Sequence, residues 1–444
     1  MQAWRWLTAT PGARLAVGVG VVAWLFLLAQ LIFFAIEQPI YSPVDEFNHY
    51  FYIQHLYYLH RPPAAGVVFQ VTTDPHVPPA FAIPPSRGSG VPMAHLYAST
   101  EGIQPPGYYL LMAPIYGLTQ HGTYAQIIAI RLATAALAAL IVPLTFLLAR
   151  VALPAAPWVW AAATWLTTLS RGYSFNLSQI TNDSLAVVVG GIGILAFLWL
   201  LRSRIDWRWG LVAGSVAGIA IFTKVTVYYV PIALAGLFAF RVIQARLKAG
   251  WLPAAAAGLL SAGVFAVPWF GGNLYRYHGL GPRTDWAHLP AALLPYHNLP
   301  LLRTFQLMFD LGSLKFWIGE TNAAAPPAWL FSIGEAGLLL CLLGYIVKPI
   351  WLDRPVPPIA LVGVWSAIGL VSLAAIVLLS QVAILNGRYI YPLFGAISVV
   401  IAAGAYRMGR LGRWLFLGTT VVLTFALVTG LIDAIAYVSR DCRC

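Results

Sequence analysis

Charged side chains are scarce in this chain: they make up 9% of its 444 residues, and cysteine occurs only three times. Cys341, Cys442 and Cys444 cannot form a disulfide framework, and their spacing fits no zinc site. The sequence also lacks low-complexity segments and the inverted repeats typical of many transporters. With 60% hydrophobic residues and a mean hydropathy of +0.77, the chain is not a soluble domain, and we interpret it as a polytopic membrane protein.

Apolar runs of about 20 residues, the length of a spanning helix, recur along the whole sequence. The first runs from Leu15 to Ile36, which is too long for a signal-peptide core, and no clear small-residue cleavage site follows it. We therefore expect an uncleaved first span. Further spans are predicted at about 124–149, 157–170, 183–201, 209–223, 225–242, 251–270, 328–347, 359–380, 387–404 and 414–438. Residues 1–444 thus form one all-α membrane domain, a bundle of about 11 transmembrane helices, with 10–13 possible.

The connections between predicted spans are basic at 202–208, 241–248, 348–354 and 407–413. If these face the cytoplasm, the positive-inside rule is satisfied throughout. The formal net charge of +12 then reflects one side of a membrane and does not indicate a nucleic-acid partner. We expect a multi-pass protein of the plasma (inner) membrane, surrounded by membrane lipid, with a cytoplasmic N-terminus.

Two long regions then lie outside, at 37–106 and 271–327. The span bundle at 107–270 lies between these two loops, and the C-terminal spans at 328–444 follow the second. The first external loop is rich in proline, which excludes one continuous helix, and its aromatic residues suit interfacial helices. Segment 107–119 is too short to span comfortably, and we predict that it is re-entrant or interfacial.

Acidic residues are also unevenly placed with respect to this topology. Of the 14 acids, Asp206 and Asp353 fall in predicted cytoplasmic loops, and the others lie outside or near outer span ends. We therefore expect an active site on the extracytoplasmic face.

Adjacent carboxylates occur just after the first span, in Ser42-Pro43-Val44-Asp45-Glu46-Phe47-Asn48-His49-Tyr50. Ser42 suits a helix N-cap and Asp45 a capping-box acid, which explains Asp45 but leaves Glu46 unexplained. His49 lies four residues after Asp45 and shares its helical face. We interpret Asp45 and Glu46 as catalytic residues, with Asp45 as the base. Asp45, Glu46 and His49 are also candidate ligands of a divalent cation such as Mg²⁺ or Mn²⁺, although an interfacial histidine is more often only amphipathic.

Further motifs follow in the same order as in a known superfamily. The chain resembles the GT-C integral-membrane glycosyltransferases, and within them uncharacterised bacterial relatives of protein mannosyltransferases and aminoarabinose transferases. The resemblance covers most of the length, and Tyr108 departs from the leucine that is common after the proline pair. Besides the acidic pair, its carriers are Gln104-Pro105-Pro106-Gly107-Tyr108-Tyr109, Thr181-Asn182-Asp183 and Asn386-Gly387-Arg388-Tyr389-Ile390-Tyr391-Pro392.

The resemblance implies transfer of a sugar from a polyprenyl-phosphate-linked donor to an acceptor hydroxyl on a lipid, glycan or protein. Asp45 would deprotonate that hydroxyl in one inverting step, because the phosphate already serves as the leaving group. Lys224 and Arg388 map to outer span ends and would hold the phosphate; their alternative role is snorkelling to the headgroups. The supporting or substrate-binding candidates are His49, Gln104, Tyr108, Arg171, Asp183 and Tyr391.

Some of these candidates have a plainer explanation. Asp183 could simply cap its helix, which we favour, and Arg171 could be an interfacial anchor. Two other functions also stay open: a transporter or flippase of a lipid-linked glycan, and a non-catalytic membrane assembly subunit. The acids lie in an external loop instead of mid-span, which counts against transport.

Overall fold

The structure is a computed structural model. It describes residues 10–38, 46–63, 68–69, 97–98, 100–119, 124–244, 251–280, 300, 303, 316–317, 328–347, 357–380 and 387–441. Asp45, the predicted base, and the proposed capping box of Ser42 and Asp45 lie outside these residues.

The predicted spans are confirmed as helices within the described residues, and the protein is an all-α polytopic membrane protein. Nine helical segments there are long and apolar enough to cross a membrane, and Trp207–Thr223 is a shorter apolar helix. The helices at the predicted spans are α2 (Pro11–Glu37), α5 (Tyr124–Ala139), α6 (Ile141–Ala152), α9 (Asp183–Arg202), α10 (Trp207–Thr223), α11 (Tyr229–Gln244), α12 (Trp251–Tyr277), α14 (Ala328–Val347), α15 (Pro358–Ser380), α16 (Tyr391–Arg407) and α17 (Gly409–Asp441).

The predicted span at 157–170 is wrong in its length. The helix α7 (Pro157–Leu166) ends four residues before the predicted boundary, and the short α8 (Arg171–Leu177) begins just after it. The hydroxyls of Thr167 and Thr168 donate to carbonyls three residues earlier, and Ser170 accepts a bond from the Tyr173 amide as the N-cap of α8. Such side chains offer the backbone an alternative to helix, which explains the break.

Small residues decide which helices approach most closely. A Cβ on Gly210 would lie 1.8 Å from the Ala254 carbonyl oxygen, so α10 and α12 pack backbone against backbone. A Cβ on Gly190 would lie 2.4 Å from the Pro392 carbonyl oxygen, so α9 and α16 do the same. The α16 span is 72% buried and the α12 span only 11%, which places α16 in the centre and α12 at the periphery.

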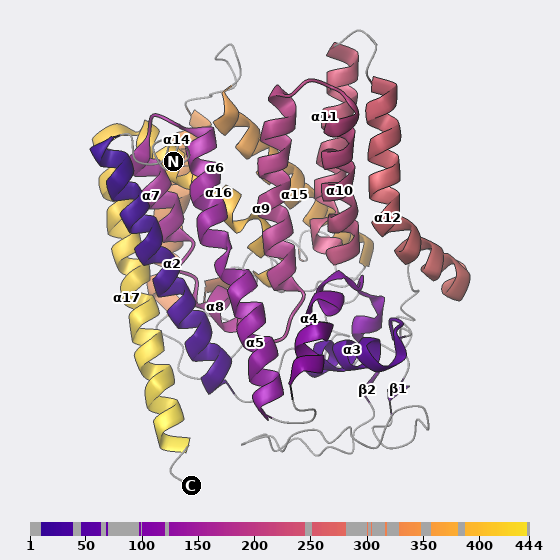
Figure 1. Cartoon of the computed structure of the whole chain (residues 1–444). Coiled ribbons are helices and arrows are strands. Elements are labelled where there is room, and N and C mark those ends of the chain that lie inside the picture. Colours follow the sequence, from indigo (N-terminus) through magenta and orange to yellow (C-terminus); the bar gives the residue numbers. More distant parts are fainter. Residues whose placement is uncertain are drawn as a thin grey trace.

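Short elements lie across one end of the bundle, opposite the connection between α9 and α10 (Figure 1). They are α3 (Glu46–Leu59), η1 (Thr100–Ile103), α4 (Gly107–Leu118) and the antiparallel pair β1 (Val68–Phe69) and β2 (Tyr97–Ala98), with Val68 opposite Ala98. With 12 residues, α4 is too short to span a membrane, as predicted for this segment. It packs against α3 and α5.

Candidate functional site

Two cations meet one carboxylate at the end of the bundle that carries α3 and α4. Lys224 Nζ lies 2.8 Å from Asp183 Oδ1, and Arg388 Nε lies 3.7 Å from Asp183 Oδ2. We call Lys224, Asp183 and Arg388 the cation cluster. The three come from segments far apart in the sequence, so only the folded bundle assembles the cluster.

Each member of the cation cluster stands at a helix junction. Asp183 is the first residue of α9, Lys224 is an extended residue between α10 and η2 (Val225–Val227), and Arg388 lies in η6 (Gly387–Ile390), just before α16. Asp183 is fully buried and Lys224 is 4% exposed. The alternative role of snorkelling does not fit Lys224, because its ammonium group points inward to a carboxylate and not to the headgroups.

The interpretation of Asp183 as a helix cap is also wrong. Asn182 holds the N-cap position of α9, and the Asp183 carboxylate bonds Lys224 and Thr181 Oγ1. Its place in the first turn still suits the helix dipole, as expected for an acid there. The N-terminus of α9 therefore contributes to the electrostatics of the cation cluster.

Glu46 forms a second buried ion pair, with Arg131 of α5. Arg131 Nε and Nη2 donate to the two Glu46 oxygens at 2.6 and 2.5 Å, and the Ile180 amide donates to Oε1 at 3.1 Å. Arg131 also donates to the carbonyls of Ala35 and Gln38. This arrangement ties the start of α3 to α2, α5 and the segment before α9.

Arg131 was not among the residues predicted from the sequence. It could have been selected, because it is the single charged residue in the predicted span at 124–149, and charged residues inside spans usually have a specific partner. The pairing with Glu46 could not be read from the sequence, since the two residues are 85 positions apart.

A chain of hydrogen bonds connects α3 with the cation cluster. His49 Nδ1 lies 2.8 Å from the Tyr109 hydroxyl, which accepts a bond of 3.4 Å from Asn182 Nδ2. Asn182 Oδ1 in turn accepts a bond of 2.7 Å from Lys224 Nζ. We call His49, Tyr109, Asn182 and Lys224 the relay. Asn182 and Tyr109 stand inside the sequence motifs but were not selected as candidates.

The metal hypothesis concerns Asp45, Glu46 and His49. No group of three His, Cys, Asp or Glu residues suited to a metal occurs in the part of the chain that the structure describes. Of the three candidate ligands, Glu46 bonds Arg131 and His49 bonds Tyr109, while Asp45 lies outside that part.

The other predicted site residues occupy buried or half-buried positions nearby. The Tyr108 hydroxyl lies 2.6 Å from Thr134 Oγ1, and burial raises the pKa of Tyr108 well above its usual value. The Gln104 carbonyl accepts a bond from Tyr52, and the Tyr391 hydroxyl accepts one from Asn176. Arg171 begins α8 and is buried. The structure thus brings Lys224, Asp183 and Arg388 together and gives Tyr108 and Gln104 packing contacts between elements.

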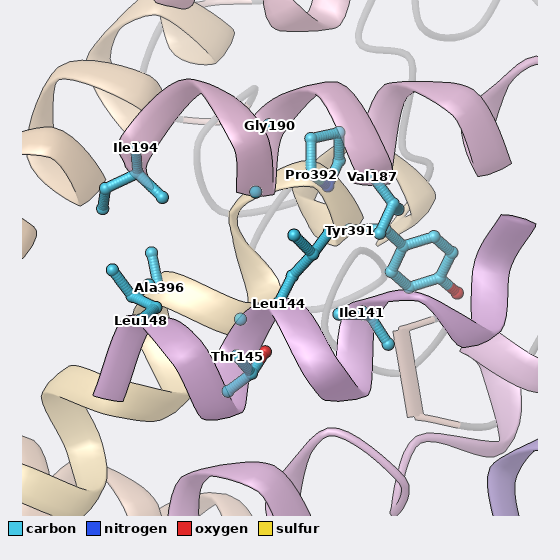
Figure 2. A pocket seen from close by; sticks show the side chains of 12 residues that line it. Ile141, Leu144, Thr145, Leu148, Val187, Gly190, Ile194, Tyr391, Pro392 and Ala396 are labelled. Carbon is cyan, nitrogen blue, oxygen red and sulfur yellow. The ribbon is translucent and has the colours of Figure 1, made fainter. Parts of the chain in front are cut away.

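An apolar pocket lies between α6, α9 and α16. Figure 2 shows α9 side chains facing those of α6 and α16 across it, with Tyr391 and Pro392 at the start of α16. α9 begins at Asp183, and α16 follows η6 with Arg388, so the pocket lies along the helices that start at the cation cluster. Its lining is Ile141, Leu144, Thr145, Leu148, Val187, Gly190, Gly191, Ile194, Tyr391, Pro392, Gly395 and Ala396.

Comparison with known proteins gives distant structural likenesses. No protein-family model matches the chain, and no curated protein matches it. ArnT from Cupriavidus metallidurans, solved bound to undecaprenyl phosphate, has 17% identity and a TM-score of 0.49, over 91% of this chain and 61% of that one. The apo oligosaccharyltransferase of Archaeoglobus fulgidus has 13% identity and a TM-score of 0.49, over 96% of this chain and 56% of that one.

The chain spans 61% and 56% of the lengths of these two proteins, and its activity, substrate and partners are therefore argued from its own residues.

Proposed function

We propose that this protein is a membrane glycosyltransferase that takes a sugar from a polyprenyl-phosphate-linked donor and transfers it to an acceptor hydroxyl. The observation that carries the proposal is the cation cluster, in which Lys224 and Arg388 converge from two separate helix junctions on Asp183. Burial of cations at the end of a membrane bundle costs free energy, and residues of this kind commonly bind substrates or ions.

Phosphate is the substrate group that this cluster suits best. Lysine and arginine are donors only, and both form charge-assisted hydrogen bonds with oxyanions. A lipid phosphate would join or replace the Asp183 carboxylate as their partner, next to the positive N-terminus of α9. The leaving phosphate would thus be stabilised as its negative charge develops.

Asp45 remains the proposed base, and its neighbour in the chain, Glu46, is firmly held. Consecutive Cα atoms are about 3.8 Å apart, so Asp45 follows wherever Glu46 is fixed. Glu46 is fixed by Arg131 and the Ile180 amide, and we propose that it positions the base instead of reacting itself. Asp45 would take the acceptor proton as that oxygen bonds the anomeric carbon and the bond from this carbon to the phosphate oxygen breaks.

The basic connections support an extracytoplasmic position for this chemistry. The connection between α9 and α10 contains Arg204 and lies at the opposite end of the bundle from α3 and α4 (Figure 1). If the basic end is cytoplasmic, the cation cluster is near the outer surface.

The experiment compares Lys224→Ala and Arg388→Ala with the wild type in reconstituted membranes, using radiolabelled polyprenyl-phosphate sugars and a membrane extract as acceptor. Each change removes a charge-assisted bond of about 1.5–3 kcal/mol, so binding of polyprenyl phosphate should weaken roughly 10- to 100-fold. Arg202→Ala, an exposed arginine at the other end of α9, is the matched control and should bind as the wild type does.

Unchanged binding in folded Lys224→Ala and Arg388→Ala proteins would contradict the phosphate site. Movement of the carrier across liposomes without sugar transfer would instead identify a flippase.

A further inference from the structure

The last helix, α17, lies at the edge of the bundle and has one buried and one exposed face (Figure 1). Its buried face packs against α14 and α16 and includes Phe416, Leu423, Ala426 and Leu427. A helix turns by about 100° per residue, so side chains three, four or seven positions apart share a face. The opposite face is a row of exposed apolar side chains, which we call the outer stripe: Trp414, Leu417, Val421, Phe425, Val428 and Ile432.

Two arginines stand at the start of the outer stripe. Arg410 and Arg413 lie in the first turns of α17, and both are exposed. At about 100° per residue, Arg410 points in the same direction as Val428, and Arg413 lies about 60° to one side. The two cations therefore precede the outer stripe on the same side of the helix, at the end of the bundle opposite α3 and α4 (Figure 1).

The charge of these arginines is not balanced by neighbouring carboxylates. Neither forms an ion pair in the part of the chain that the structure describes, and the sequence has no acidic residue between Arg407 and Ile432. Arg413 lies over the ring of Tyr406 in α16, 4.9 Å from its centroid, and Tyr406 stacks on Trp158 of α7. A contact of this kind orients the guanidinium group and leaves its N–H donors for an anion.

We propose that the start of α17 binds an anionic phospholipid, with the headgroup phosphate at Arg410 and Arg413 and the acyl chains along the outer stripe. Arginine is a donor only and forms charge-assisted hydrogen bonds with phosphate oxygens. Trp414, which is 71% exposed, directly follows Arg413, and tryptophan is enriched at the level of the headgroups. The apolar side chains that follow then lie at the depth of the lipid tails.

The excess of positive charge selects the kind of headgroup. A zwitterionic headgroup brings an ammonium group with its phosphate, and the arginines repel that group, whereas a headgroup with a net negative charge avoids the repulsion. A basic residue next to a span favours anionic lipid about 5-fold, so the pair should favour it roughly 30-fold over a zwitterionic lipid. This site lies at the opposite end of the bundle from α3 and α4, and its test does not depend on the proposed function.

The test measures which phospholipid lies against α17. A fluorophore is attached to Val421→Cys in the outer stripe, in a background with the three native cysteines replaced by serine, and the protein is reconstituted in phosphatidylcholine membranes. Phosphatidylglycerol or phosphatidylcholine with a nitroxide on the acyl chain is then added in equal amounts, and the ratio of quenching gives the preference. We expect phosphatidylglycerol to quench more strongly, and Arg410→Gln with Arg413→Gln should remove most of the difference.

The matched control is Arg204→Gln with Arg208→Gln, which removes two exposed arginines from the connection between α9 and α10 at the same end of the bundle. The control should keep the preference for phosphatidylglycerol. Quenching by phosphatidylcholine should persist in every variant, because α17 still faces lipid. Such quenching shows that a lost preference is not a loss of the fold.

Three results would overturn the proposal. The first is equal quenching by the two lipids with both arginines present. The second is an equal loss of preference in the control, which would mean that all basic connections attract anionic lipid without a site at α17. The third is loss of the preference in excess inorganic phosphate but not in chloride of the same ionic strength, which would mean that the arginines bind an anion without its lipid.

Discussion

At the scale of single residues, the site depends on charges that are buried together. The Glu46–Arg131 pair is fully buried, with both side chains 0% exposed. Such a pair contributes little net stability compared with apolar residues, but loss of one partner leaves a buried charge that is costly. Its value here is geometric, because it fixes the start of α3.

Glu46→Gln should therefore destabilise the protein by about 3–5 kcal/mol, since Arg131 keeps its charge without a carboxylate. The measurement is reversible unfolding in mixed detergent micelles. The double variant Glu46→Gln with Arg131→Met is the control, and it should recover much of the loss. If the loss of unfolding free energy in the double variant equalled the sum of the losses in the two single variants, the residues would not interact.

Asp45→Asn tests the proposed base. Asparagine retains the size and most of the capping ability of aspartate, so stability should fall by at most about 1 kcal/mol. It cannot accept a proton at neutral pH, and sugar transfer should fall by roughly 10²-fold or more. The assay is transfer of radiolabelled sugar by purified protein, and a folded variant with undiminished transfer would remove Asp45 from the mechanism.

At the scale of elements, the sequence predicted the helices well and one connection badly. Long apolar runs predicted the spans, because an apolar segment inside a bilayer must satisfy its backbone hydrogen bonds internally and therefore forms a helix. The run at 157–170 is apolar like the other predicted spans. The backbone nevertheless leaves the helix there, because α7 ends and α8 begins where the hydroxyls of Thr167, Thr168 and Ser170 bond nearby backbone groups. Side-chain bonds to the backbone compete with helix formation locally, and a hydropathy average does not contain them.

The site, like the fold, was predictable in part: its residues could be selected, but their contacts could not. Lys224 and Arg388 could be selected from their place at outer span ends, and Asp183 from its motif. Their convergence on one carboxylate depends on how α9, α10 and α16 pack, and no local pattern encodes that. The relay was missed for the same reason, since His49, Tyr109 and Asn182 come from three elements.

The contact between α9 and α16 gives a prediction at this scale. A Cβ on Gly190 would lie 2.4 Å from the Pro392 carbonyl oxygen and 2.8 Å from the Tyr229 hydroxyl, so Gly190→Ala must separate the two helices. Overpacking of this kind costs about 1–3 kcal/mol. Asp183 begins α9 and Arg388 lies just before α16, so a shift between these helices should also displace the cation cluster. Transfer activity should therefore fall together with stability.

Thermal unfolding and transfer assays on the purified variant check this expectation. Gly236→Ala in α11 is the control: a Cβ there meets nothing within 4 Å, and it should be neutral or slightly stabilising. If Gly190→Ala kept full stability and activity, the close approach of α9 and α16 would not matter for the site.

At the scale of the whole molecule, the fold has two chemically different ends. One end holds α3 and α4 (Figure 1), and Asp183 of the cation cluster begins α9 there; the other end carries the connection between α9 and α10, which contains Arg204. The orientation of the bundle in the membrane decides which compartment supplies the acceptor.

Cysteine labelling of intact cells tests this orientation. In a background with Cys341, Cys442 and Cys444 replaced by serine, a membrane-impermeant maleimide should label Gly281→Cys but not Arg204→Cys or Arg410→Cys. The basic connections would then be cytoplasmic, as the positive-inside rule predicts. Labelling at position 204 but not at 281 would invert the map.

The wide sequence separation of the cation cluster also bears on how the protein is made. Asp183 enters the membrane with α9, whereas Arg388 is synthesised about 200 residues later, roughly 10–40 s at 5–20 residues per second. During that interval α9 carries a carboxylate into the bilayer with Lys224 as its nearest cationic partner in the chain. The cluster therefore makes completion of the bundle depend on the arrival of η6 and α16, and a nascent chain that stalls before them exposes an incompletely paired acid to the membrane quality-control machinery.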